Sequence, residues 1–204
     1  MQAKEPLLEE EYEEMRLVIL TRIYLIAQGY RMAYFPFHPL SVSLSSSKEE
    51  TMIIIEKCVE HLIHKNFIES RAWGMISITH KGIKEIENLL EESFHKKSST
   101  SEEKKKIASQ IKHSIGESKL SEVREIQRLR YDILERASLL AGQKDEAMNI
   151  FTIGQPLGIE KEKLDRIYFY LEDEGLTKFH AIGGYFFITD KGLKRAKDGP
   201  NRIL

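Results

Sequence analysis

Hydrophobic and polar residues alternate along this chain with two periods, one typical of helices and one typical of strands. From residue 12 to residue 28, apolar side chains recur every three or four positions and predict a helix. A longer helix is predicted from about residue 48 to residue 65. Ser47 and Glu50 match a capping box at its start, and Asn66 suits a left-handed stop at its end.

Two short alternating runs follow this second helix. They cover residues 67–71 and 75–78 and predict a β-hairpin. A closing helix is expected to start near Thr79.

The second half of the chain follows the same plan. A helix reaches Ala141, a short helical turn covers residues 150–154, and a longer helix runs from about residue 160 to residue 174. Gly175 is expected to end this longer helix. Strands over residues 176–179 and 185–188 predict a second hairpin, and a glycine pair in its turn supplies positive φ angles. A last helix, capped by a threonine, closes this half.

An internal repeat links the two halves. Residues 19–27 recur as residues 133–141 with five identities in nine positions, at an offset of 114. Residues 78–84 recur as residues 188–194 with five identities in seven, at an offset of 110. Because both blocks occur in the same order, the pattern indicates a duplicated domain.

This order of elements resembles the winged-helix domains of bacterial and archaeal regulators. The resemblance is closest in the segments Leu171-x3-Gly175-Leu176 and Phe187-Ile188-Thr189-x-Lys191-Gly192. The Pro-containing segment 33–47 departs from the pattern where a second helix belongs. The resemblance implies an α+β, mainly helical fold with two winged-helix domains, each of about three helices and a hairpin wing.

These domains are expected at residues 1–92 and 120–204, joined by a linker at residues 93–119. The linker begins rich in Ser and Lys, a composition that buries little. Three isoleucines at four-residue spacing then predict an amphipathic helix that packs on its own neighbouring domain or, alternatively, forms a dimer: Ile107, Ile111 and Ile115.

The resemblance implies double-stranded DNA as the first partner to consider, with the long helix in the major groove. Residues 1–92 hold 10 Lys and Arg against 15 Asp and Glu, residues 93–120 hold 7 against 3, and residues 121–204 hold 14 against 14. Acidity in the first repeat disfavours phosphate binding there. The second repeat is therefore the expected reader.

Cationic and aromatic residues on the second long helix and its hairpin are the DNA-binding candidates. On the helix, three of them fall on neighbouring turns of one face, and two hairpin residues are placed to reach phosphate; a solvated helix face is the alternative interpretation. The candidates are Lys161, Lys163, Arg166, Tyr170, Lys178 and His180. A DNA-binding transcription regulator is the favoured function.

Surplus apolar residues favour the alternative, a non-enzymatic protein-interaction subunit that resembles the tandem winged-helix scaffolds of kleisin-binding or sorting complexes. Residues 52–55 are consecutive and apolar, so they cannot all face one small core. Met52 and Ile53 join the three linker isoleucines as candidate contacts for a protein partner or a homodimer.

Chemistry-bearing motifs are weak in this sequence. Cys58, His61 and His64 are spaced three residues apart on one predicted helix, and Cys58 and His64 are too splayed to share a zinc ion easily. No catalytic residue, metal site or cofactor is predicted, and an enzyme is not expected. A lone cysteine, no long apolar segment and no secretory signal predict a cytoplasmic protein without a membrane span.

Overall fold

The computed structural model describes residues 9–27, 31, 33–45, 49–94, 117–141 and 146–199. This part of the chain is mainly helical and carries two small antiparallel sheets, which confirms the α+β class. The chain divides into two compact units, Met1–Lys119 and Leu120–Leu204, called unit 1 and unit 2 below. The three linker isoleucines, Ile107, Ile111 and Ile115, lie outside the described residues.

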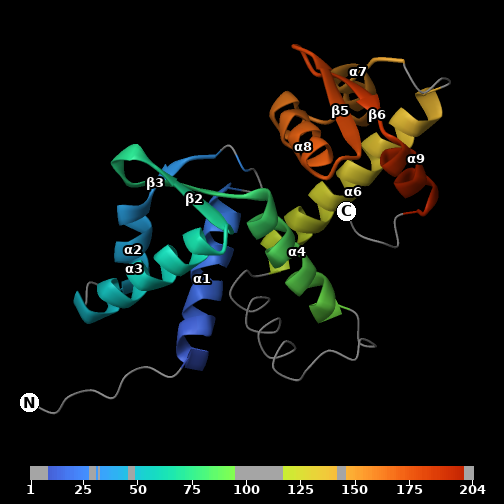
Figure 1. Cartoon of the computed structure of the whole chain (residues 1–204). Helices are drawn as coiled ribbons and strands as arrows, with labels where there is room; N and C mark the ends of the chain where they lie inside the picture. The colour runs from blue at the N-terminus through green and yellow to red at the C-terminus, as the bar shows by residue number, and fades with distance from the viewer. Residues whose placement is uncertain are drawn as a thin grey trace, which may run out of the picture. The chain divides into compact units, whose positions relative to one another are not determined.

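Unit 1 has the predicted order of helix, hairpin and closing helix (Figure 1). Its elements are α1 (Glu9–Ala27), β1 (Phe35–Pro36), α2 (Phe37–Ser45), α3 (Glu49–His64), β2 (Ile68–Arg71), the 3-10 turn η1 (Ala72–Gly74), β3 (Met75–Ile78) and α4 (His80–Phe94). The sheet order is β1-β3-β2, with Ile68 opposite Ile78 and Arg71 opposite Met75. Ser47, the expected cap of α3, lies outside the described residues.

Unit 2 repeats this order (Figure 1). Its elements are α6 (Glu117–Leu140, which begins shortly before the division), β4 (Met148–Asn149), α7 (Ile150–Gly154), the 3-10 turn η2 (Gln155–Leu157), α8 (Lys161–Asp173), β5 (Thr177–Ala181), β6 (Tyr185–Ile188) and α9 (Asp190–Lys197). The sheet order is β4-β6-β5, with Thr177 opposite Ile188 and Ala181 opposite Tyr185. Sequence analysis did not predict β1 or β4, because two residues are too short to show an alternating pattern.

The long helix before each hairpin ends in the same left-handed turn. In unit 1, Asn66 has a φ of 60°, and the backbone N–H of Phe67 donates to the carbonyl of Leu62 at 2.9 Å. In unit 2, Gly175 has a φ of 67°, and Leu176 donates to Leu171 at 2.9 Å. These bonds close a Schellman motif, which satisfies carbonyls that the helix end leaves open. Both predicted helix stops are confirmed.

A Thr-x-Lys-Gly motif joins this helix end to the next helix in unit 2. The Thr189 hydroxyl donates to the carbonyl of Gly175 at 2.7 Å and accepts from the backbone N–H of Gly192 at 3.0 Å. The Thr189 backbone N–H donates to the carbonyl of Leu176 at 3.0 Å, and the Lys191 ammonium donates to the carbonyl of Glu174. Thr189 therefore caps α9, as predicted, and also fixes where α9 starts relative to the end of α8.

Unit 1 repeats these bonds with Thr79, Lys81 and Gly82. Thr79 donates to the carbonyl of Asn66 at 2.7 Å and accepts from Gly82 at 3.1 Å, while Lys81 donates to the carbonyl of Lys65 at 2.9 Å. The glycine is required sterically, because a Cβ there would lie 2.1 Å from a backbone carbonyl oxygen in either unit. Three of the five identities in the second repeat block are thus the residues that make this junction.

Candidate nucleic-acid interface

Helix α8 presents two lysines near its start. Its buried side faces the core of unit 2 through Leu164, Ile167 and Leu171. Lys161 is exposed, and its ammonium lies 5.6 Å from the centre of the Phe151 ring. The Lys163 side chain is 44% exposed and pairs loosely with Glu125 on α6, at 3.8 Å. An exposed pair of this kind contributes little, so both lysines can reach solvent or a phosphate.

The other two α8 candidates lie differently from the prediction. Arg166 is only 18% exposed and donates to the Glu162 carboxylate at 2.6 Å, so its charge is already paired. Tyr170 is 4% exposed, and the guanidinium of Arg130 on α6 lies 3.4 Å from the centre of its ring. Tyr170 cannot contact DNA, and that prediction is wrong. Lys163 and Tyr170 lie on one face of α8, but that face is exposed only at Lys163 and is covered by α6 at Tyr170.

The β5–β6 hairpin carries the remaining candidates on its outward side. Lys178 and His180 are both exposed, and Lys178 lies opposite Phe187. Cross-strand partners share a face, so Lys178 and Phe187 lie on the side away from the core residue Phe186. The His180 and Phe187 rings are 4.4 Å apart. Tyr185, two residues before Phe187, is on the same side and 43% exposed.

We call Lys178, His180, Tyr185 and Phe187 the outer hairpin face. Sequence analysis missed its two aromatic rings. The signal was present, because four apolar residues in a row at 185–188 on a small sheet must place alternate side chains away from the core.

The hairpin turn connects this face to the start of α8. Ile182 at the turn is 93% exposed, and Gly183 and Gly184 have φ angles of 95° and 82°, as predicted for a glycine pair. Gly184 packs against Phe151, since a Cβ there would lie 2.8 Å from the ring. Phe151 in turn lies under Lys161. Lys161 is therefore near the hairpin turn in space.

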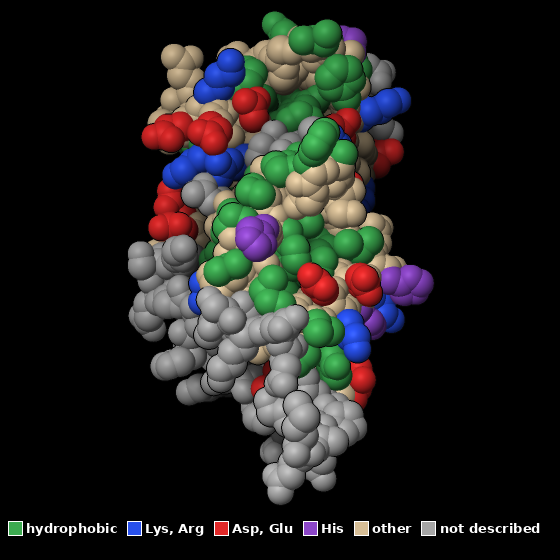
Figure 2. Space-filling view, turned by 90° about the vertical axis from the view of Figure 1, so that its left-hand side faces the viewer, with side chains coloured by type: hydrophobic (Ala, Val, Ile, Leu, Met, Phe, Trp, Pro, Cys, Tyr) green, Lys and Arg blue, Asp and Glu red, His purple; other side chains and the backbone are tan. Residues whose placement is uncertain are grey.

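Helix α3 of unit 1 stands where α8 stands in unit 2, but its surface differs. Ile53 is 51% exposed, Met52 is partly buried, and Ile55 is fully buried, so the apolar run does not face one core, as expected. Glu56 and Glu60 are exposed on the same helix, and Val42 of the neighbouring α2 is 40% exposed. Figure 2 views the α2 and α3 side of unit 1 and shows hydrophobic side chains with acidic and histidine side chains between them. Exposed apolar and acidic side chains thus share the surface of α2 and α3.

The unit 1 hairpin ends in an exposed tryptophan. Trp73 is 96% exposed and has a φ of 68°, in the left-handed region that most side chains avoid. On strand β2, just before this turn, the Arg71 guanidinium lies 4.1 Å from the centre of the Tyr34 ring. The Tyr34 hydroxyl donates to the Glu69 carboxylate of the same strand. This bond raises the pKa of Tyr34, with burial and the Glu69 charge as further causes.

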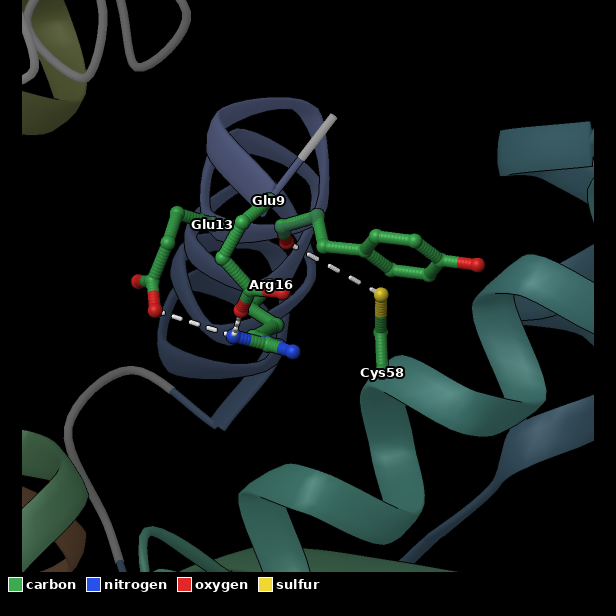
Figure 3. Close-up of polar contacts among 5 residues, drawn as sticks. Glu9, Glu13, Arg16 and Cys58 are labelled. Carbon is green, nitrogen blue, oxygen red and sulfur yellow. Dashed lines mark hydrogen bonds and ion pairs between the residues drawn. The ribbon is translucent and has the colours of Figure 1, made fainter. Parts of the chain in front are cut away.

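Cys58 is part of the packing between α1 and α3 (Figure 3). It is fully buried, its thiol points at the carbonyl of Tyr12 at 3.9 Å, and burial raises its pKa. Nearby, Arg16 forms ion pairs with Glu9 at 3.0 Å and Glu13 at 2.9 Å. A buried thiol with a raised pKa is a poor nucleophile. His61, one turn along α3, has its pKa lowered, chiefly by burial.

Among the described residues, no three His, Cys, Asp or Glu side chains gather as a metal site requires. No helix in that part of the chain combines the length and apolar character that crossing a bilayer demands. No protein-family model, no curated protein and no solved structure matches the chain.

Proposed function

We propose that both units are winged-helix domains and that the chain is a DNA-binding protein, a transcription regulator, whose unit 2 contacts double-stranded DNA. The order of helix, short strand, helix, helix, hairpin and closing helix in both units supports this proposal. The observation that carries it is the exposure of Lys161 and Lys163 on α8 together with Lys178 and His180 on the hairpin. Arg166 and Tyr170 are not part of the proposed interface.

The charges on unit 2 set the expected strength of binding. Residues 121–204 carry 14 basic and 14 acidic side chains, so attraction must come from the local group of lysines. Each phosphate neutralised contributes a slope of about −0.9 to the dependence of log affinity on log salt. Two or three contacts therefore give a slope of roughly −2 to −3.

The test is an anisotropy titration of a labelled 20-base-pair duplex over a range of salt. Lys163→Glu and Lys178→Glu are each expected to weaken binding and to reduce the salt slope by about 1. Lys57→Glu is the matched control, since it makes the same charge change at an exposed position of α3 in unit 1. No binding at low salt, or an equal loss with the control, would contradict the proposal.

Trp73 favours a second function, a protein-interaction subunit in which unit 1 docks on a protein partner or a second copy. Both hairpins have three-residue turns, Ala72–Gly74 and Ile182–Gly184, so Trp73 occupies the place of Gly183. Glycine or asparagine is the usual residue at this position of a hairpin turn, because φ is positive. A large aromatic side chain held at that cost in full exposure is typical of a contact residue.

The fluorescence of Trp73 tests this second function directly, since the chain has one tryptophan. If copies associate through unit 1, Trp73 is buried in the associated form and exposed in the monomer. Its emission maximum should then move to longer wavelength as the protein is diluted. Light scattering after size exclusion should show the dimer become a monomer over the same range. A Trp73→Asn variant that associates as strongly as the parent would exclude Trp73 as the contact.

A further inference from the structure

The outer hairpin face of unit 2 combines two exposed rings, Tyr185 and His180, and the partly buried Phe187 ring with an exposed cation. We infer that it is a stacking site for the unpaired bases of single-stranded DNA. The inference rests on the proposed DNA-binding function and adds the single strand as a second form of DNA that the hairpin binds. It is carried by Tyr185, the His180–Phe187 ring pair and Lys178, none of which the core of unit 2 requires on that side.

The unit 1 hairpin shows that the fold does not demand these rings. By strand register, Glu69 and Ser77 of unit 1 occupy the places of Lys178 and Phe187, and Met75 occupies the place of Tyr185. Ser77 is fully buried there, and its hydroxyl donates to the carbonyl of Arg31. The same scaffold thus forms with an acid, a thioether and a hydroxyl where unit 2 has a lysine and two aromatic rings.

Charge complementarity selects nucleic acid as the ligand of this face. On α8, Lys163 and Arg166 each have a carboxylate partner, Glu125 and Glu162. Lys178, in contrast, makes no ion pair with another described residue and lies beside the rings. A phosphate held by Lys178 leaves the attached base next to Tyr185 and Phe187, and base stacking on aromatic rings is tolerant of sequence.

Unpaired bases fit this face better than a duplex does. In a duplex the flat faces of the bases are covered by their neighbours, whereas a single strand can turn each base onto a protein ring. The bases would stack on the Tyr185 ring, which is 43% exposed, while the backbone follows edge strand β5 from Lys178 toward the turn. Lys161, near that turn, supplies a second phosphate contact.

The experiment compares a labelled 20-nucleotide oligo(dT) with the labelled duplex at the same low salt, using the full chain. Tyr185→Ala should weaken oligo(dT) binding about tenfold and leave duplex binding within about twofold, because one stacking contact is lost. Tyr185→Phe keeps the ring and should bind like the parent. Met75→Ala changes the equivalent position of unit 1 and should have no effect on either ligand.

Three outcomes would overturn the inference: no oligo(dT) binding, no effect of Tyr185→Ala on it, or an equal loss with the duplex. Photo-crosslinking of 5-iodouracil in oligo(dT) to the unsubstituted chain tests the site without a substitution. A crosslink within residues 177–188 supports the inference, and crosslinks confined to unit 1 contradict it. Duplex binding that depends on Lys163, together with oligo(dT) binding that does not depend on Tyr185, would leave the proposed function standing while this inference fails.

Discussion

Replacing Gly192 with alanine sets two physical effects against each other. Gly192 lies in the first turn of α9, where helix propensity alone predicts that alanine stabilises by about 1 kcal/mol. The new Cβ, however, would lie 2.1 Å from the carbonyl oxygen of Leu176 and 2.9 Å from Cγ1 of Ile188. The carbonyl belongs to the backbone and cannot turn aside, so α9 must move away from the end of α8.

That movement breaks the junction at several points. The Thr189 N–H bond to Leu176, at 3.0 Å, and the Gly192 N–H bond to the Thr189 hydroxyl, at 3.0 Å, are each worth about 1 kcal/mol. Overpacking adds about 1–3 kcal/mol. After the gain in propensity, the net loss of stability of unit 2 is about 2–4 kcal/mol, which lowers its melting temperature by roughly 10–30 °C for a domain of this size.

Hydrogen exchange read by mass spectrometry separates the two units, because unit 1 peptides serve as an internal reference. Peptides covering residues 176–197 should lose protection in Gly192→Ala, while those of unit 1 keep it. Gly175→Ala is the control, since a Cβ at this position would meet no other atom and only the φ of 67° is unfavourable for alanine. This variant should lose about 1 kcal/mol of stability. If Gly192→Ala melts at or above the parent temperature, the steric argument is wrong.

Three further predictions follow from single residues. Thr189→Val removes the cap of α9 and should destabilise unit 2 by about 1–2 kcal/mol in urea unfolding, whereas Thr189→Ser should restore most of the loss. Trp73→Asn relieves an unfavourable φ without removing a buried side chain, so it should stabilise unit 1 by about 0.5–1 kcal/mol; a loss of stability would refute this. Burial, with help from the Glu172 charge, raises the pKa of Tyr168 to about 12. Above pH 10 the unfolded chain releases this proton first, so stability should fall as the pH rises from about 10 to about 12, and Tyr168→Phe should flatten that fall.

Local sequence signals predicted most of the fold. The left-handed stops at Asn66 and Gly175 and the Thr189 cap depend on neighbours within a few residues, and the structure has all three. The burial of Tyr170, in contrast, depends on Arg130, which lies forty positions earlier in the sequence and whose guanidinium covers the ring. Helical spacing places residues on a common face, but it cannot tell how far along the helix that face stays exposed.

The candidate site shows the same limit. The winged-helix resemblance pointed to the long helix and the hairpin, and the lysines and His180 are the polar, cationic or titratable side chains that the sequence places there. Tyr185 and Phe187 were missed because apolar residues in a strand are normally assigned to the core. Only the register with Lys178, fixed by the turn and the pairing of β5 with β6, shows which of the four face outward.

The Thr-x-Lys-Gly junction also separates the structural role of the chain from its binding role. Its bonds end on backbone carbonyls at residues 65–67 and 174–176, and they involve no side chain of the outer hairpin face. Exposed side chains of either hairpin can therefore be exchanged without changing the bonds that fix the angle at which the hairpin leaves the helix. Transplanting Lys178 and Tyr185 onto the equivalent positions of unit 1, Glu69 and Met75, while the buried Ser77 is kept, is a direct way to move a ligand preference from one half of a duplicated protein to the other.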